Sequence, residues 1–148
     1  MSGQRVAEQA DVQEITVPAA MEQIETVTDF VNGWLDRHEC QEPVQIQLDI
    51  AVDEVFGNIV RYAYGSGTGT ATVRIGAEEE TGMISITFID GGTPFNPLEK
   101  EMPDTTGLRA RERPIGGLGL FIIKKKMDRI TYDYQDGKNI LTIYKKNH

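Results

Sequence analysis

The chain has 148 residues, which suits a single globular domain with a sizeable core. Its contents of 39% apolar and 26% charged residues are typical of a soluble protein, and no apolar run is long enough to span a membrane. The net charge of −8 argues against non-specific binding of nucleic acid, because an acidic surface repels the phosphate backbone. We therefore expect small molecules or proteins as partners.

The N-terminal region and the cysteine content together indicate a cytoplasmic location. Residues 1–5 lack the apolar core of a secretory signal, and the single Cys40 cannot form an internal disulfide bond. Residues 1–12 are polar and aperiodic. We therefore expect a flexible N-terminus over 1–12, followed by one domain over 13–148.

Two helices are expected in the first half of the chain, after a short strand over 13–17. From 19 to 38, and again from 44 to 62, apolar residues recur at the spacing of one helix face. The residues that set this spacing are Ile24, Val27, Val31, Trp34 and Leu35 in the first helix, and Leu48, Val52, Val55 and Ile59 in the second.

The second half of the chain has the period of β-strands. Residues 70–75 and 83–89 alternate or run apolar, and 129–134 and 139–144 are joined by an Asp-Gly pair that strongly indicates a hairpin. Between these two pairs of strands, a long loop rich in proline and glycine suggests a lid, and 118–127 suit a helix. This order predicts an α+β fold, a two-layer α/β sandwich in which a mixed sheet of four or five strands carries helices on one face.

Glu54 and Asn58 interrupt the apolar pattern of the second helix. Because they are four residues apart, their side chains lie on one face of that helix. A carboxylate beside an amide oxygen can ligate Mg²⁺, or can place a base next to a metal ligand. An ordinary polar pair on an exposed helix face is the competing explanation, and taken alone the pair favours it.

Asp90 ends an apolar strand and is followed by Gly91 and Gly92. A carboxylate at a strand end can accept a hydrogen bond from an exocyclic amine such as that of adenine. Glycine after it lets the backbone approach a flat ring closely. A plain Asp-Gly turn is the competing explanation.

Gly116, Gly117 and Gly119 stand at the start of the helix expected over 118–127. Glycines there expose backbone N–H groups at the positive end of the helix, where an anion can bind, although a flexible hinge explains them too. The motif is neither a Walker A loop nor a dinucleotide-binding sequence. Nearby basic residues suit either a solvated surface or the surroundings of bound phosphates. They are Arg109, Arg111, Arg113, Lys124, Lys125, Lys126 and Arg129.

The order of these motifs resembles the N, G1 and G2 boxes of the GHKL superfamily of Bergerat-fold ATPases, which includes gyrase, histidine kinases and a heat-shock chaperone. The resemblance covers roughly residues 44–145. Within the superfamily, the segments 49–64, 90–97 and 115–143 look like those of bacterial anti-sigma factor serine/threonine kinases.

The resemblance implies ATP and Mg²⁺ as ligands and suggests a role for each motif. Asn58 would ligate Mg²⁺, and Glu54 would act as the general base on a Ser or Thr hydroxyl of a partner protein. Asp90 would receive the adenine amine, and Gly92 would let the ring lie flat. The other implied nucleotide-binding residues are Gly116, Gly117, Leu118 and Gly119 around the phosphates, Thr142 beside the adenine, and an arginine of the lid over 98–115.

Two positions depart from the family pattern. Pro94 stands where a second glycine often follows the Asp of the G1 box, and Tyr62 stands where some members carry a histidine one turn after the Asn. Neither His38 nor His148 has a setting that suits a phosphoacceptor. We therefore do not expect a complete sensor histidine kinase.

The resemblance is compatible with three functions. The first is a kinase that phosphorylates a small anti-anti-sigma-like protein, also holds a sigma factor, and so regulates transcription. The second is a nucleotide-gated binding protein without useful catalysis, in which ATP orders the lid. The third is a slow ATPase module that dimerises. Members of the family often form homodimers through the first helix, but Val31 and Trp34 in that helix suit a core equally well.

Overall fold

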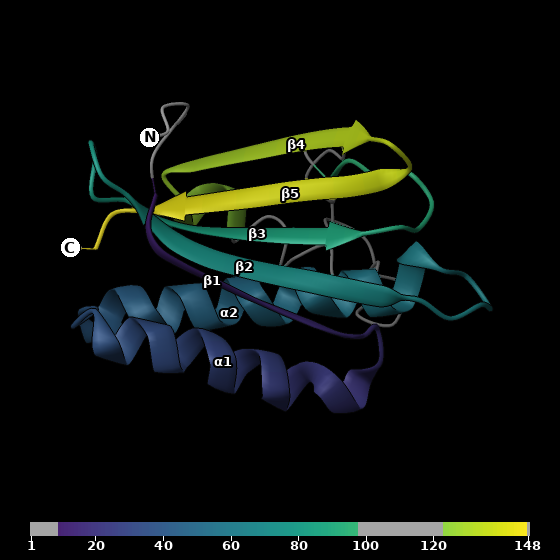
Figure 1. The fold of residues 1–148 in the computed structure, drawn as a ribbon, viewed down its shortest axis with the longest axis horizontal. Coiled ribbons are helices and arrows are strands. Elements are labelled where there is room, and N and C mark those ends of the chain that lie inside the picture. The colour runs from purple at the N-terminus through teal and green to yellow at the C-terminus, as the bar shows by residue number, and fades with distance from the viewer. Residues whose placement is uncertain (1–8, 98–122, 148) are drawn as a thin grey trace, which may run out of the picture.

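The computed structural model describes residues 9–97 and 123–147, and in that part of the chain five strands form one sheet (Figure 1). The strand order is β1-β2-β3-β5-β4, and every neighbouring pair is antiparallel. The strands are β1 (Gln9–Pro18), β2 (Thr70–Glu78), β3 (Ile84–Asp90), β4 (Arg129–Gln135) and β5 (Lys138–Lys145). The helices are the short 3₁₀ helix η1 (Met21–Gln23), α1 (Ile24–Arg37), α2 (Glu42–Asn58) and the π-helix η2 (Ile59–Ala63).

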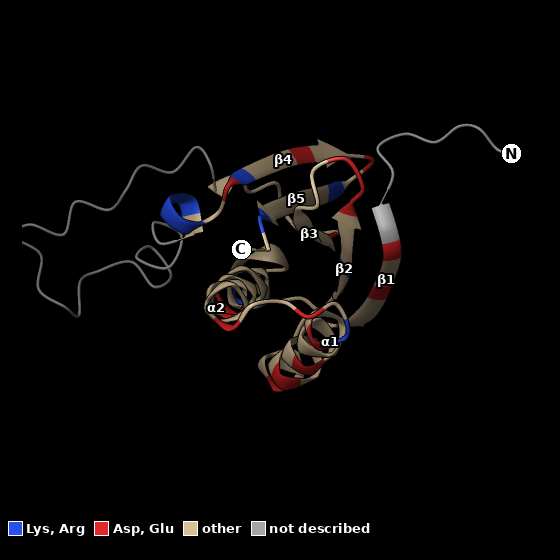
Figure 2. Ribbon diagram, turned by 90° about the vertical axis from the view of Figure 1, so that its left-hand side faces the viewer, with Lys and Arg blue, Asp and Glu red and all other residues tan. Residues whose placement is uncertain are grey.

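The two long helices lie on the same face of the sheet, so the fold has two layers (Figure 2). This arrangement confirms the predicted α+β sandwich with helices on one face. The described sheet is antiparallel, however, and not mixed as predicted. For β1 and β2 the reason is that α1 and α2 form a helical hairpin, which returns the chain to the end of the sheet where β1 finished, and there Pro18 pairs with Thr70.

The core lies between these helices and the inner face of the sheet. On β3 the alternate residues Ile84, Ile86 and Phe88 face the helices and are buried. Val31 and Trp34 of α1 are 0% and 1% exposed, so they belong to the core of this chain. A dimer surface on the first helix therefore cannot be built from these two side chains.

β1 begins at Gln9, four residues before the strand that the sequence predicts, so residues 9–12 belong to the sheet. A bulge interrupts its pairing with β2 near this start, and Asp11 adopts a positive φ of 48°. The Asp11 carbonyl accepts a hydrogen bond from Trp34 Nε1 at 2.8 Å. Because this contact uses the backbone, the polar side chains of the segment gave no sign of the strand.

The hairpin between β4 and β5 is the one predicted at Asp136 and Gly137. Both residues have positive φ values, 54° and 77°, which is the conformation of a type I′ turn. In the resulting register, Asn139 of β5 lies opposite Asp90 of β3. The hairpin thus brings a polar side chain to the end of β3.

The predicted helix over 44–62 begins two residues earlier and changes pitch within its span. It is α-helical to Asn58 and continues as η2, whose wider π-turn is uncommon and occurs often at functional sites. Residues 123–126 are helical, inside the predicted helix 118–127, whereas the lid 98–115 lies outside the described residues. In the described part of the chain, no helix has the length and apolar character to cross a membrane.

Candidate functional site

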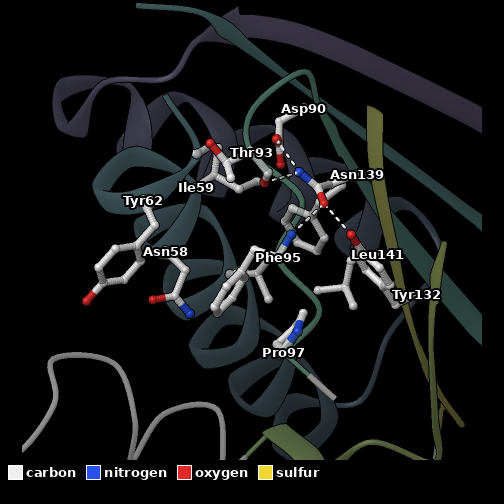
Figure 3. A pocket seen from close by; sticks show the side chains of 13 residues that line it. Asn58, Ile59, Tyr62, Asp90, Thr93, Phe95, Pro97, Tyr132, Asn139 and Leu141 are labelled. Atoms are coloured by element: carbon white, nitrogen blue, oxygen red, sulfur yellow. Dashed lines mark hydrogen bonds between the residues drawn. The ribbon is translucent and has the colours of Figure 1, made fainter. Parts of the chain in front are cut away.

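A solvent-open pocket lies between the C-terminal part of α2 and the ends of β3 and β5 (Figure 3). The apolar residues of its lining are Val55, Ile59, Tyr62, Ala63, Phe88, Phe95, Pro97, Tyr132 and Leu141. The polar residues are Asn58, Asp90, Thr93 and Asn139. Such a lining suits a ligand with a flat apolar body and a few hydrogen-bonding groups.

Asp90 ends β3 with its side chain in this pocket and only 6% exposed. Its Oδ1 accepts hydrogen bonds from the backbone N–H of Gly92 at 2.8 Å and from Asn139 Nδ2 at 3.0 Å. Among the described residues, none donates to its Oδ2. The carboxylate is therefore fixed in orientation and can accept a further hydrogen bond from a ligand.

Asn139 connects the polar groups at this end of the pocket, and sequence reasoning missed it. Its Nδ2 also donates to the carbonyl of Thr93 at 2.9 Å, and its Oδ1 accepts from the N–H of Phe95 at 3.0 Å and from the hydroxyl of Tyr132. The side chain is 6% exposed and makes four hydrogen bonds. Its position two residues after a hairpin turn was a signal, but its link to Asp90 depends on a strand pairing that is remote in sequence.

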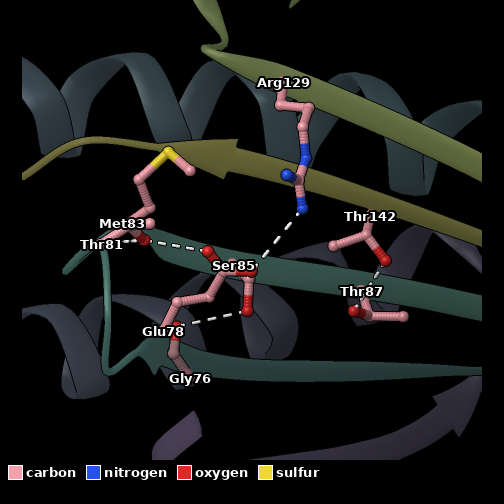
Figure 4. Close-up of polar contacts among 8 residues, drawn as sticks. All are labelled: Gly76, Glu78, Thr81, Met83, Ser85, Thr87, Arg129 and Thr142. Atoms are coloured by element: carbon pink, nitrogen blue, oxygen red, sulfur yellow. Dashed lines mark hydrogen bonds and ion pairs between the residues drawn. The ribbon is translucent and has the colours of Figure 1, made fainter. Parts of the chain in front are cut away.

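Thr142, which we expected beside the adenine, does not line the pocket. It follows Asn139 by three residues on β5, so its side chain points to the opposite face of the sheet. There its hydroxyl is hydrogen-bonded to that of Thr87 at 3.0 Å, and the helices lie behind the sheet (Figure 4). The prediction for Thr142 is therefore corrected, because Asn139 is the residue of this strand that faces Asp90.

The turn after β3 approaches the end of η2 closely, and Gly92 permits this approach. A Cβ atom at Gly92 would lie 2.1 Å from the carbonyl oxygen of Ala63, and Thr93 donates its N–H to the same oxygen at 2.8 Å. Tyr64, which sequence reasoning also missed, accepts a hydrogen bond from the N–H of Gly91 at 2.8 Å. A contact of Gly92 with a bound ring stays a prediction.

Asn58 ends α2, lines the pocket and is 7% exposed. Glu54 lies one turn earlier, as its spacing predicts, but it is not among the residues that line the pocket. Burial raises the pKa of the Glu54 carboxyl, and the nearby Arg61 guanidinium and Asn58 amide oppose this shift only in part. Glu54 Oε2 and Asn58 Nδ2 are buried and have no hydrogen-bond partner in the described part of the chain. These atoms leave capacity for a polar ligand.

The oxygen atoms of these two side chains are of the type that Mg²⁺ prefers. Asn58 has an amide oxygen and Glu54 a carboxylate. Mg²⁺ usually takes one or two protein oxygens and completes its shell with phosphate oxygens and water. The donor set therefore fits Mg²⁺ that is bound together with a phosphorylated ligand.

The motif predicted to bind phosphates lies outside the described residues, so its role stays a prediction. Its residues are Gly116, Gly117, Leu118 and Gly119, and the lid arginines Arg109, Arg111 and Arg113 share this status. The described residues resume at 123 with a helical segment whose ribbon Figure 2 colours blue for basic residues. These are Lys124, Lys125 and Lys126.

The sequence matches the family described as "Histidine kinase-like ATPase domain" over residues 17–145, and the chain belongs to this family. The match runs from β1 to β5 and includes Glu54, Asn58 and Asp90. The fold and the pocket thus define a histidine kinase-like ATPase domain of the Bergerat type, as the sequence motifs predicted.

Several similar proteins carry the names of protein kinases. The chain is 33% identical to the serine-protein kinase RsbW of Listeria innocua over 98 residues, which cover 64% of this chain and 61% of that protein. It is 31% identical to RsbW of Oceanobacillus iheyensis, over 88% of this chain and 84% of that protein. It is 25% identical to the serine/threonine-protein kinase BtrW of Bordetella bronchiseptica, over 93% and 94%. The match thus spans less than two thirds of the length of the Listeria protein.

A solved structure supports the fold. The crystal structure of the RsbU and RsbW domains of Rv1364c from Mycobacterium tuberculosis superimposes with a TM-score of 0.65 at 16% identity. The superposition covers 93% of this chain and 32% of that chain. At this identity the likeness concerns the fold alone.

Proposed function

We propose that this chain is an ATP- and Mg²⁺-binding protein serine/threonine kinase of the anti-sigma factor type. The observation that carries the proposal is one pocket with Asp90 on its sheet side and Asn58 on its helix side. The names of the similar proteins, RsbW and BtrW, support the kinase assignment.

Asp90 would bind the exocyclic amine of adenine through Oδ2. An ionised carboxylate only accepts hydrogen bonds, so it attracts an amine and repels a carbonyl oxygen at the same place. Asn139 holds Asp90 in that orientation, and the apolar side chains of Ile59 and Leu141 provide surface for a flat ring. This arrangement favours adenine over guanine, which carries a carbonyl at the corresponding ring position.

Asn58 would ligate Mg²⁺, and the backbone N–H groups of the glycine motif, with Gly116, Gly117, Leu118 and Gly119, would hold the phosphates. When bound, the ion would neutralise charge on the transferring phosphoryl group. Glu54 would accept the proton of the attacking Ser or Thr hydroxyl. Burial raises the pKa of Glu54, which makes its carboxylate a better base.

We also propose a small anti-anti-sigma-like protein as the phosphorylated partner, a sigma factor as a second partner, and regulation of transcription as the outcome. The support for this partner class is the resemblance of the segments 49–64 and 90–97 to anti-sigma factor kinases. Direct contact with nucleic acid is not expected from a net charge of −8. The cytoplasmic location stays a prediction.

Calorimetric titration of ATP, with and without Mg²⁺, tests the pocket. Asp90→Asn replaces a carboxylate, which only accepts hydrogen bonds, by an amide whose NH₂ group donates them. We therefore expect a loss of ATP affinity of about 100-fold, or 2.7 kcal/mol. Asp133→Asn on β4 is the matched control, because its carboxylate is exposed, and it should bind ATP like the wild type. If the wild-type protein binds no ATP in either condition, the proposed function is wrong.

Phosphoryl transfer to purified anti-anti-sigma-like proteins, followed with labelled ATP, tests the role of Glu54. Glu54→Gln should abolish transfer and leave ATP binding intact, whereas Glu25→Gln on the exposed side of α1 should change neither. Transfer by Glu54→Gln at the wild-type rate would contradict the role of general base.

A nucleotide-gated binding protein is the second candidate, and the position of Glu54 outside the lining of the pocket favours it. In that case ATP would strengthen binding to the partner, and no phosphate would be found on any partner by mass spectrometry. The same titrations and transfer assays therefore separate the two candidates.

A further inference from the structure

Arg61 of η2 folds back along the helix toward Asn58 and Glu54. Its Nη2 donates a hydrogen bond to Asn58 Oδ1 at 3.3 Å. Gly57 leaves room for it, since a Cβ atom at that position would lie 3.4 Å from Nη1 and 3.5 Å from Nη2 of the guanidinium. The positions of Glu54, Asn58 and Arg61 differ by four and three residues, so all three lie on one side of the helix.

Each of these three side chains keeps one buried polar atom unpaired. The atoms are Glu54 Oε2, Asn58 Nδ2 and Arg61 Nε, which have no hydrogen-bond partner among the residues that the structure describes. Leaving such atoms unpaired costs free energy, and a polar ligand relieves that cost. A bound polar ligand would therefore complete the hydrogen bonding around Asn58.

The oxygen that Arg61 holds is the same oxygen that would ligate Mg²⁺. A guanidinium in hydrogen-bond contact with Asn58 Oδ1 would stand next to the ion, and two adjacent cations repel each other strongly in a partly buried site. We propose that the Arg61 guanidinium occupies Asn58 Oδ1 in the free protein and must leave this oxygen when Mg²⁺ binds with the nucleotide. This inference rests on the proposed function and assigns to Arg61 a positioning role within it.

Two consequences follow for nucleotide binding. Without Mg²⁺, Arg61 supplies positive charge on the helix side of the pocket and supports a bound polyphosphate. With Mg²⁺, Arg61 competes for Asn58 Oδ1 and weakens the hold on the ion. Both effects reduce the extent to which Mg²⁺ strengthens nucleotide binding, so removal of the guanidinium should increase it.

The test is the ratio of the Kd measured without Mg²⁺ to the Kd measured with Mg²⁺, by calorimetry with the β,γ-imido analogue of ATP. In Arg61→Met, which keeps the length of the side chain but not the charge, we expect this ratio to rise about tenfold. Arg61→Lys keeps the charge and should stay near the wild type. Arg74→Met is the matched control, because Arg74 is an exposed arginine of β2 paired with Glu14, and its ratio should not change.

A second measurement uses the metal alone. Mn²⁺ is titrated into the free protein as a paramagnetic substitute for Mg²⁺, and the broadening of the Asn58 side-chain amide signal is followed by NMR. In Arg61→Met the broadening should begin at about tenfold lower Mn²⁺ concentration than in the wild type. A structural role of Arg61 would change the thermal midpoint but would not produce this shift.

The outcomes separate this inference from the proposed function. If the wild type binds no nucleotide, the proposed function fails. The Mn²⁺ titration then still shows whether Arg61 competes with the metal ion for Asn58 Oδ1. If the wild type binds nucleotide but the ratio in Arg61→Met is unchanged or lower, the inference about Arg61 is wrong and the proposed function stands. If Arg61→Met binds the nucleotide more weakly than the wild type does when Mg²⁺ is present, the inference is also wrong.

Discussion

The two ends of the pocket differ in how completely their hydrogen bonds are made without a ligand. At the sheet end, formed by Asp90 and Asn139, the Asn139 side chain makes four hydrogen bonds and fixes the carboxylate. At the helix end, Asn58 lines the pocket, and Glu54 and Arg61 lie on the same side of the helix. Each of these three side chains keeps a buried atom without a partner in the described residues. The sheet thus prepares one end of the site in advance, whereas the helix end needs a ligand to be complete.

This difference has an energetic meaning. A group that is already fixed costs little conformational freedom when a ligand binds, so the sheet end supports affinity and specificity. At the helix end, the unpaired atoms and the competing cation make binding dependent on the ionic conditions. We therefore expect changes at the sheet end to damage folding and binding together, and changes at the helix end to alter ligand dependence with little damage to folding.

Gly92→Ala should have the largest effect, because the turn after β3 leaves no room for a side chain. The added Cβ would lie 2.1 Å from the Ala63 carbonyl oxygen and 2.4 Å from its carbon, and these are backbone atoms that cannot move aside alone. We expect a loss of about 3 kcal/mol in the free energy of unfolding, and a thermal midpoint lower by roughly 10 °C. Calorimetric or circular dichroism melting measures both.

Gly33→Ala in α1 is the matched control for this substitution. A Cβ there would lie 3.7 Å from Arg37 Nη1, an ordinary contact with the end of a flexible side chain. Alanine also favours the helix more than glycine, so the control should gain about 0.5–1 kcal/mol. Equal effects of the two substitutions would mean that the close approach at Gly92 is not a constraint on the fold.

Asn139→Leu should have the next largest effect. It keeps the approximate size of the side chain but removes the donors to Asp90 and Thr93 and the acceptor for Phe95. Buried groups left unpaired cost about 1–3 kcal/mol in stability. The freed Asp90 carboxylate should also bind ATP about tenfold more weakly, which calorimetric titration would measure.

Thr142→Val on the same strand is the control for Asn139→Leu. Its hydroxyl is bonded to Thr87 on the outer face of the sheet, so ATP affinity should not change and stability should fall by at most about 1 kcal/mol. If Thr142→Val weakened ATP binding as much as Asn139→Leu, the assignment of Asn139 to the pocket in place of Thr142 would be contradicted.

The contrast between Thr142 and Asn139 shows how far the sequence could predict the site. Local patterns were sufficient for the α2 pair of Glu54 and Asn58, because helix spacing alone places two side chains on one face. They were also sufficient for the hairpin at Asp136, whose turn chemistry is local. The partner of Asp90 depends on the register of β5 on β3, and a slip of one residue turns every side chain to the other face.

The same distinction explains the outcome for the fold. The layers and the strand pattern follow from hydrophobic periodicity, so the sequence could predict the α+β class that the structure confirms. The direction in which β1 and β2 pair follows from how α1 and α2 return the chain, and the start of β1 depends on the Asp11 bulge and its backbone contact with Trp34. These are contacts between distant segments, for which the sequence carries no local signal.

Glu54→Gln at the helix end should have the smallest effect on folding, and the effect should depend on pH. Burial raises the pKa of Glu54 in the folded protein above the ordinary value of 4.5. The folded state therefore holds this proton more tightly than the unfolded chain does. By linkage, the contribution of Glu54 to the free energy of unfolding falls as the pH rises from near the unfolded pKa through the raised folded pKa.

Glutamine has no charge to desolvate, so Glu54→Gln should remove this pH dependence. Urea unfolding should give nearly equal stabilities for variant and wild type at about pH 4, where the wild-type carboxyl is largely protonated, and a gain for the variant of at most about 1 kcal/mol at about pH 7. The attraction between the Glu54 carboxylate and Arg61 acts in the opposite direction. A variant less stable than the wild type at neutral pH would therefore mean that this attraction outweighs burial, and that the helix end is stabilised by its charges before any ligand binds.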